Sequence, residues 1–192
     1  CRPGVVHRLD RFTSGVMVAA KSDTAHWRLG RQFEKRQTQK RYLAVVHGEM
    51  SPFADRIEQP LGKHPTSREK YAVRYDDLAK EALTIYRVRE LYEGYTLVEL
   101  ELRTGRTHQI RAHAAAISTP IVGDGKYGGV NAHPGGEIPR KLHLHARSID
   151  IAHPDGGRLF IEADLPPHMK ASWKLLGFDL RDAEDAFAGL EE

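Results

Sequence analysis

Residues 81–102 limit the choice of fold more strongly than any other stretch of the chain. They read EALTIYRVRELYEGYTLVELEL, two runs rich in β-branched and aromatic residues, separated by Glu93-Gly94. Runs of this composition favour strands, and a short glycine-containing break between them favours a tight turn. The sequence therefore predicts a β-hairpin with its turn at Glu93-Gly94.

Further strands and three helices are predicted around this hairpin. The runs GVMVAAK (residues 15–21) and KRYLAVVHG (residues 40–48) are of strand length. Apolar residues four apart predict an amphipathic helix from Ser22, and a second helix is expected with Thr107 as its cap; a short one should begin near Pro167. Because strands outnumber helices and do not alternate regularly with them, we expect an α+β domain with a mixed, largely antiparallel sheet.

Length and composition limit the size of the core and the cellular compartment that we expect. The 192 residues, 40% of them hydrophobic, suffice for one sizeable core. The single cysteine, Cys1, excludes an internal disulfide and fits a reducing compartment. No apolar run approaches the length of a membrane span, and the first residues do not resemble a signal peptide. We expect a cytoplasmic protein without a membrane partner.

Charge is distributed unevenly along the chain. The segment 178–192 holds six acidic residues and one arginine, which leaves 28 basic and 20 acidic side chains in residues 1–177. A basic body of this kind suits a polyanionic partner, and nucleic acid is the commonest one. The sequence thus predicts a basic domain at 1–177 suited to a nucleic-acid partner, followed by an acidic C-terminal tail.

The segment HRLDRFTSG places Asp10 between two cations, Arg8 and Arg11. Neighbouring positive charges favour the ionised form of an aspartate, so Asp10 could act as a nucleophile or as the orienter of a base. A turn residue with solvated neighbours would show the same local pattern, and the segment alone leaves both interpretations open.

Two other signals point to cofactors and metals, and both are weak. The segment GDGKYG satisfies the glycine pattern of dinucleotide sites, but the residues after it cannot form the helix that such a site requires, so we interpret its glycines as turn residues. His143 and His145 would share one face of a strand, whereas His108 and His113 would not share a face of a helix. We therefore expect neither a bound cofactor nor a metal.

The segment RTGRTHQIRAH (residues 103–113) gathers three arginines and several hydrogen-bond donors at the predicted start of a helix. Such a place favours anions. By itself the cluster could be a phosphate site. Together with an ionised Asp10 it suggests that Arg111 pairs with that carboxylate and fixes its direction.

HRLDRFTSG, KRYLAVVHG and RTGRTHQIRAH together resemble the motifs of RluA-type pseudouridine synthases, in the same order. PIVGDGKYG, LHLHA and ADLPPHMK are weaker matches, and the resemblance extends to about residue 177. It implies the pseudouridine synthase catalytic fold and an enzyme that isomerises uridine in ribosomal or transfer RNA. It implies that no cofactor is needed, since the bond rearrangement requires only side chains.

The resemblance also assigns roles to single residues. Asp10 would be the catalytic aspartate, Tyr42 would lie against the uracil and assist proton removal, and Arg111 would pair with the catalytic carboxylate. Because a stacked uridine is inaccessible, the substrate would be an RNA with a flipped-out uridine. The residues that we predict to contact RNA, from the motifs and the charge pattern, are Arg8, Arg11, Lys35, Arg36, Lys40, Arg41, Arg106, His108 and Gln109.

The chain departs from the family pattern in one respect. The resemblance implies a strand and a Lys-Pro-x-Gly turn before HRLD, often with a small S4-type RNA-binding domain, and we expect these parts to be absent here. A monomer is expected. Two other function classes remain as alternatives: an RNA-binding module without catalysis, and a metal-dependent RNA hydrolase.

Overall fold

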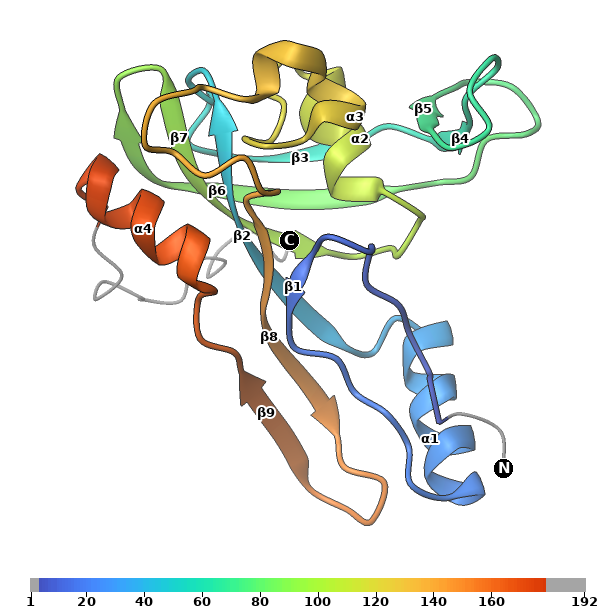
Figure 1. The fold of residues 1–192 in the computed structure, drawn as a ribbon. Helices are drawn as coiled ribbons and strands as arrows, with labels where there is room; N and C mark the ends of the chain where they lie inside the picture. Colours follow the sequence, from blue (N-terminus) through green and yellow to red (C-terminus); the bar gives the residue numbers. More distant parts are fainter. Residues whose placement is uncertain (1–3, 179–192) are drawn as a thin grey trace.

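The predicted hairpin lies inside the main sheet of the computed structural model, which describes residues 4–178 (Figure 1). Its strands are β6 (Leu83–Tyr92) and β7 (Tyr95–Leu102), and Gly94 in the turn has a φ of +77°. A positive φ is readily adopted by glycine, which explains the turn signal. The other strands are β1 (Ser14–Gly15), β2 (Gln39–His47), β3 (Ala54–Glu58), β4 (Leu61–Lys63), β5 (Tyr71–Val73), β8 (Leu144–Ala152) and β9 (Arg158–Glu162).

The seven-stranded sheet has the order β1-β8-β2-β7-β6-β3, and β9 also pairs with β8. Only the short β1–β8 ladder is parallel among the described strands; the other ladders of this sheet are antiparallel. β4 and β5 form a separate two-stranded ribbon. The predicted α+β class with a mixed, largely antiparallel sheet is therefore confirmed.

Strand β2 is buried on both faces because helices cover both sides of the sheet. Tyr42 and Ala44 pack toward α2 (Gln109–Ala116), whereas Leu43 and Val45 pack toward α4 (Pro167–Leu176). Successive side chains of a strand point to opposite faces. This two-sided burial accounts for the nearly continuous apolar run of the strand.

The N-terminal segment forms a closed loop, and the strand predicted at 15–21 is wrong except for Gly15. Gly15 has a φ of +119°, and a Cβ there would lie 2.2 Å from the Ala146 carbonyl oxygen, so the chain passes too close to β8 for a side chain. Beyond it, the Val18 N–H donates to His7 Nε2 (2.9 Å) instead of to a strand. The Ala20 N–H donates to the Gly4 carbonyl (2.6 Å), which brings the ends of segment 4–20 together.

The three predicted helices are present. Helix α1 (Asp23–Glu34) begins at Ser22, whose hydroxyl accepts the Ala25 N–H. Helix α4 starts at Pro167 as predicted. The predicted Thr107 cap of α2 is wrong, because His108 occupies the N-cap position in a left-handed conformation (φ +55°) without a side-chain capping bond.

Two short helical segments, α3 (Gly125–Gly128) and η1 (Gly129–Ala132), follow α2. Figure 1 shows α2 and α3 near the β4–β5 ribbon, with α1 beside the start of β2. Across residues 4–178, no helix combines the length and the apolarity needed to span a bilayer. The acidic tail lies outside the described residues apart from Phe178.

Candidate active site

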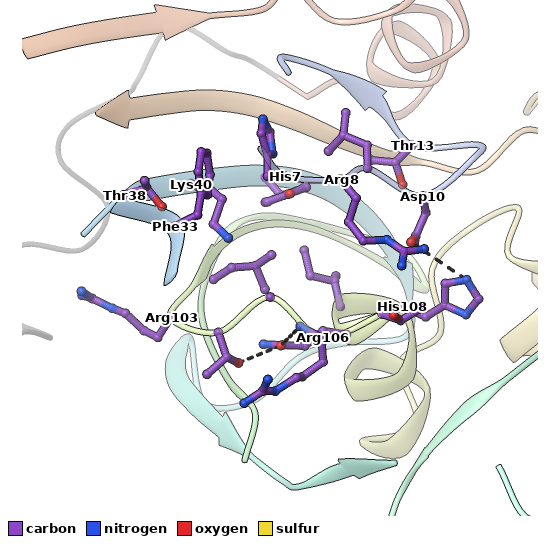
Figure 2. Close-up of a pocket in the computed structure, with 18 of the residues that line it drawn as sticks. His7, Arg8, Asp10, Thr13, Phe33, Thr38, Lys40, Arg103, Arg106 and His108 are labelled. Atoms are coloured by element: carbon purple, nitrogen blue, oxygen red, sulfur yellow. Dashed lines mark hydrogen bonds and ion pairs between the residues drawn. The ribbon is translucent and has the colours of Figure 1, made fainter. Parts of the chain in front are cut away.

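A cavity of about 520 Å³ opens between the loop that contains Asp10, the start of β2 and the segment 102–110. Figure 2 shows Arg8, Asp10 and His108 toward one end of it, and Lys40, Thr38 and Arg103 toward the other. A volume of this size is typical of sites for small ligands. Three segments that are distant in the sequence therefore meet around one concave space.

Asp10 lies in a tight turn at the wall of this cavity. The Thr13 N–H donates to the Asp10 carbonyl (3.0 Å), and the Asp10 side chain is only 13% exposed. Its carboxylate oxygens lie 3.7 Å from Arg111 Nη1 and 4.0 Å from His108 Nε2. The fold thus brings the two sequence segments that carry Asp10 and Arg111 together, as the motifs predicted.

Arg111 has a closer partner that the sequence did not indicate. Its Nε and Nη2 donate to the two carboxylate oxygens of Asp124 at 2.8 and 2.7 Å, and the Asp124 side chain is fully buried. Burial acts to lower the pKa of Arg111, but the hydrogen bonds and charge of Asp124 raise it above its usual value. Two of the guanidinium nitrogens are therefore held by Asp124, while Nη1 faces Asp10.

Asp124 owes its position to the turn that precedes α3. Gly123 has a φ of +81°, and a Cβ there would lie 1.9 Å from the Lys141 carbonyl oxygen. Asp124 then caps α3 by accepting the Tyr127 N–H at 3.2 Å. The glycine-rich segment that imitated a dinucleotide site is thus a turn and a short helix that place a carboxylate under Arg111. In the sequence, the feature that could have pointed to this partner of Arg111 is an aspartate between two turn glycines.

His108 is tied to Tyr127 on its other side. The Tyr127 hydroxyl accepts the Tyr71 N–H (2.9 Å) and lies 2.8 Å from His108 Nδ1. Burial lowers the pKa of His108, an effect that the Asp10 charge only partly opposes, so the imidazole is neutral near pH 7. With the phenol donating to Nδ1, we assign the imidazole hydrogen to Nε2, the nitrogen that faces Asp10.

Tyr42 lies in the core on the same face of β2 as Lys40, and both line the cavity. Burial raises the pKa of the Tyr42 phenol, and the nearby charge of Asp10 raises it further. The phenol is therefore neutral at physiological pH. Burial lowers the pKa of Lys40, whose ammonium lies 5.8 Å from the centre of the Phe33 ring.

Eight of the nine residues predicted to contact RNA divide into two groups, and Arg41 is described below. Those that line the cavity are Arg8, Arg36, Lys40, Arg106 and His108, together with the buried Gln109. Arg11 and Lys35 are exposed but do not line it. The first group therefore concentrates positive charge around the cavity.

Two members of the predicted RNA-binding set have other partners. Arg41 points to the opposite face of β2 from Lys40 and lies 3.8 Å from buried Glu101. Gln109 is 2% exposed, and its amide bonds to Thr104, Arg106, Leu83 and Thr84. Arg41 does not line the cavity, whereas Gln109 lines it and also holds the segment 104–109 together; RNA contact by either residue stays a prediction.

The buried histidines at 113, 143 and 145 each have both ring nitrogens in hydrogen bonds. Their partners are Thr84 and Gln59 for His113, Lys141 and Ser172 for His143, and Ser14 and Ala163 for His145. Within residues 4–178, no group of three or more His, Cys, Asp or Glu side chains is placed to hold a metal ion. These three histidines join separate parts of the fold.

Burial of His143 predicts a loss of stability in mild acid. Burial lowers the pKa of His143 to about 4, whereas an unfolded histidine titrates near 6.5. Between these values the unfolded chain binds more protons than the folded one, so stability falls as the pH is lowered from about 6.5 toward 4. We expect this residue to account for about 2 kcal/mol between pH 7 and pH 5.

Urea unfolding at pH 7 and pH 5 would measure this dependence. His143→Asn should reduce the difference between the two pH values, while the control His26→Asn, at an exposed site on α1, should leave it as in the parent chain. Equal pH dependence in His143→Asn and the parent would contradict the prediction.

Comparison with solved structures identifies the fold. The chain is similar to human RNA pseudouridylate synthase domain containing 1, with a TM-score of 0.76 and 29% identity, over 88% of this chain and 73% of that one. Human RNA pseudouridylate synthase domain containing 4 gives the same TM-score at 28% identity, over 91% of this chain and 76% of that one. The fold is therefore that of a pseudouridylate synthase domain.

Sequence comparisons agree with this class. The family model described as RNA pseudouridylate synthase matches residues 1–116. An uncharacterized RNA pseudouridine synthase of Aquifex aeolicus is 40% identical over 185 residues, which cover 90% of this chain and 57% of the relative. Ribosomal large subunit pseudouridine synthase D of Xanthomonas campestris pv. campestris is 42% identical over 165 residues, 81% of this chain and 49% of that protein. The chain belongs to the RNA pseudouridylate synthase family, as the motifs predicted, and it spans about half the length of the curated relatives it matches.

Proposed function

We propose that this chain carries the catalytic centre of an RNA pseudouridine synthase that isomerises a uridine of ribosomal or transfer RNA. The observation that supports this most strongly is the placement of Asp10. Its carboxylate lies at the wall of a ligand-sized cavity, facing an arginine that Asp124 holds in place. Membership of the family adds independent support.

The reaction needs few groups because it is an isomerisation. The bond between ribose C1′ and uracil N1 breaks, the detached base turns, and a new bond joins C1′ to uracil C5. The proton on C5 leaves, and N1 gains one, so atoms balance without an oxidant or reductant. Asp10 would begin the reaction, either by adding covalently to the substrate or by removing a proton from the sugar.

Arg111 and His108 would define the direction of the Asp10 carboxylate. The Arg111 cation favours the anionic form of the carboxylate, while the neutral His108 adds no second full charge that would compete with Arg111. Arg111 Nη1 and His108 Nε2 lie 3.7 and 4.0 Å from the Asp10 carboxylate oxygens. The side toward the cavity is left for the substrate.

Tyr42 would lie against the uracil ring. Because its pKa is raised, the phenol keeps its hydrogen and would transfer a proton only by accepting one as it gives up its own. Its buried ring also forms a water-poor wall that helps to retain the detached base. Assistance in proton removal by Tyr42 is thus compatible with a neutral side chain.

The substrate would be a uridine turned out of its stack, since the cavity is too small for a duplex. The cations at its mouth would hold the neighbouring phosphates. The name of the Xanthomonas relative, a ribosomal large subunit synthase, favours ribosomal RNA over transfer RNA. The monomeric state and cytoplasmic location expected from the sequence stay predictions.

Tritium release tests this function directly. RNA labelled with tritium at uracil C5 should lose label to water when incubated with the chain, because formation of the new bond expels that hydrogen. Since the proposed steps use only side chains, we expect the rate to be the same in EDTA and without added nucleotides.

Three outcomes separate the candidate functions. Release in EDTA supports the synthase. Strand cleavage that EDTA abolishes and zinc or magnesium restores would indicate a metal-dependent hydrolase. Tight RNA binding with neither release nor cleavage, on the host RNAs and with the chain well folded, would indicate a binding module.

A further inference from the structure

Tyr127 on α3 contacts both of the groups that face Asp10. Its hydroxyl lies 2.8 Å from His108 Nδ1, and its ring centre lies 5.1 Å from Arg111 Cζ, with the guanidinium over the ring face. Its backbone N–H donates to Asp124, the carboxylate that holds Arg111. Tyr127 does not line the Asp10 cavity. It therefore joins the two partners of Asp10 from outside the cavity.

The neighbours of the Tyr127 hydroxyl set the direction of its hydrogen bonds. The Tyr71 backbone N–H, at 2.9 Å, can only donate, so it occupies a lone pair of the phenol oxygen. Burial raises the pKa of the phenol to about 12, so the oxygen keeps its own hydrogen at physiological pH. That hydrogen is donated to His108 Nδ1, which leaves the hydrogen of the neutral imidazole on Nε2, 4.0 Å from an Asp10 carboxylate oxygen (Figure 2).

Packing holds Tyr127 in place on two sides. Its side chain packs against a buried cluster that includes Leu61 of β4 and Ala112 of α2, between the β4–β5 ribbon and that helix. A Cβ on the next residue, Gly128, would lie 2.8 Å from the Ala132 Cβ, so α3 is packed closely against the segment that follows it. A side chain anchored in this way can hold a hydrogen-bonded neighbour in one orientation.

His108 depends on Tyr127 for its orientation. Its φ of +55° lies in the left-handed region, and as the N-cap of α2 it makes no side-chain capping bond. Within residues 4–178, its ring nitrogens have polar contacts with the Tyr127 hydroxyl and, at 4.0 Å, with Asp10, while the Tyr71 ring lies edge-on at 6.1 Å. Loss of the Tyr127 hydroxyl would therefore free the imidazole to turn and to exchange its hydrogen between the two nitrogens.

We propose that Tyr127 is a positioning residue of the Asp10 site, whose hydroxyl keeps the hydrogen of His108 on Nε2 so that an N–H faces the Asp10 carboxylate. This inference rests on the proposed function. An N–H that points at a carboxylate stabilises its negative charge, whereas the lone pair of the other tautomer would repel it. Tyr127 thus acts on the reaction through His108 and not by contact with the substrate.

The charges around His108 decide what the imidazole does without the phenol. Burial keeps the pKa of His108 below its usual value. The carboxylates of Asp10 and Asp124 favour the imidazolium, and the cations Arg111 and Lys126 oppose it. A hydrogen bond that Nδ1 accepts stabilises the neutral ring, so its removal should raise this pKa. The variant should therefore contain more of the Nδ1–H tautomer, which turns a lone pair to Asp10, and more imidazolium, whose full charge competes with Arg111.

Tyr127→Phe tests the hydroxyl alone, because the ring that lies under Arg111 remains. The matched control is Tyr86→Phe, which removes the hydroxyl of a buried tyrosine outside the Asp10 cavity, together with its 3.1 Å hydrogen bond to the Pro52 carbonyl. Thermal melts of both variants measure the stability lost with each hydroxyl. A loss of rate in Tyr127→Phe that Tyr86→Phe does not share is then no general effect of a missing phenol.

Nitrogen NMR reads the state of His108 whether or not the chain is active. In the ¹⁵N-labelled parent at pH 7, the long-range spectrum of the imidazole should show hydrogen on Nε2 and none on Nδ1, with His108→Gln used to assign the signals. Tyr127→Phe should show a large share of the Nδ1–H tautomer or of the imidazolium. Tyr86→Phe should give the pattern of the parent.

Tritium release in a single turnover measures the consequence for the reaction. Tyr127→Phe should lower the rate about tenfold to a hundredfold, the range expected when the hydrogen-bond partner of a functional histidine is lost, with the RNA Kd unchanged. The loss should grow as the pH falls from about 8 to about 6, because imidazolium accumulates in the variant first. In a His108→Gln background, the same substitution should have no further effect.

Three results would overturn the proposal: the tautomer of the parent in Tyr127→Phe, a rate equal to that of Tyr86→Phe, or an equal loss in the His108→Gln background. This proposal and the proposed function fail separately. If the parent releases tritium and Tyr127→Phe does so at the same rate, the positioning role is wrong and the function stands. If no chain releases tritium while Tyr127→Phe changes the tautomer, the control of His108 by Tyr127 stands without the synthase function.

Discussion

Asp10→Asn is expected to lower the rate of pseudouridine formation by at least about 10³-fold, with little change in folding or RNA affinity. Asparagine preserves the size of the side chain, and the turn is closed through the Asp10 backbone carbonyl, which the variant retains. What disappears is the negative charge that the proposed reaction uses as nucleophile or base. Tritium release from RNA labelled at uracil C5 is the measurement.

A matched control is available on the surface. Asp77→Asn makes the same chemical change at an exposed position outside the Asp10 cavity and should leave the rate unchanged. A thermal melt and a binding titration on both variants separate catalysis from folding. If a well-folded Asp10→Asn protein released label at a rate close to that of the parent, Asp10 would be a turn residue after all.

Arg111→Met is expected to produce the largest loss of stability of the variants considered, about 3–5 kcal/mol. The substitution leaves the carboxylate of Asp124, whose side chain is fully buried, without its bidentate partner. A buried unpaired charge costs far more than an exposed one, because water cannot compensate it. Urea unfolding would measure the loss, and activity should fall as well, since Asp10 also loses its cation.

Two further variants show whether the loss comes from this pair. Arg158→Met removes an ion pair with Asp150 at 2.8 Å in which the arginine is largely exposed, and it should cost less than about 1 kcal/mol. Arg111→Met/Asp124→Leu removes both buried charges and should recover a large part of the stability but none of the activity. A cost of Arg111→Met no greater than that of Arg158→Met would show that the buried pair contributes little.

The sequence predicts those parts of the fold whose signals are local. The hairpin followed from two β-rich runs and one glycine turn, and α1 followed from apolar residues four apart after Ser22. The strand predicted at 15–21 fails because a tertiary contact decides it: the passage of Gly15 against Ala146 turns the chain away from the ladder.

The sequence predicted which residues belong to the candidate site better than it predicted which of them pair with each other. Arg111 does face Asp10, but its bidentate partner is Asp124, which lies in a turn whose conformation depends on the distant Lys141 carbonyl. Lys40 and Arg41 look alike in the sequence, but successive side chains of a strand point to opposite faces. Lys40 therefore faces the cavity and Arg41 does not. Which face a side chain occupies is decided by the neighbouring strands.

The closed loop at residues 4–20 has a consequence for substrate recognition. Its ends are joined by the hydrogen bond from Ala20 to Gly4. Its interior is fixed by the hydrogen bond from Val18 to His7 and by the pairing of Gly15 with β8. Asp10 therefore acquires its place when the chain folds. The conformational entropy of this loop is lost when the chain folds. RNA binding therefore does not have to order the loop in order to position the carboxylate.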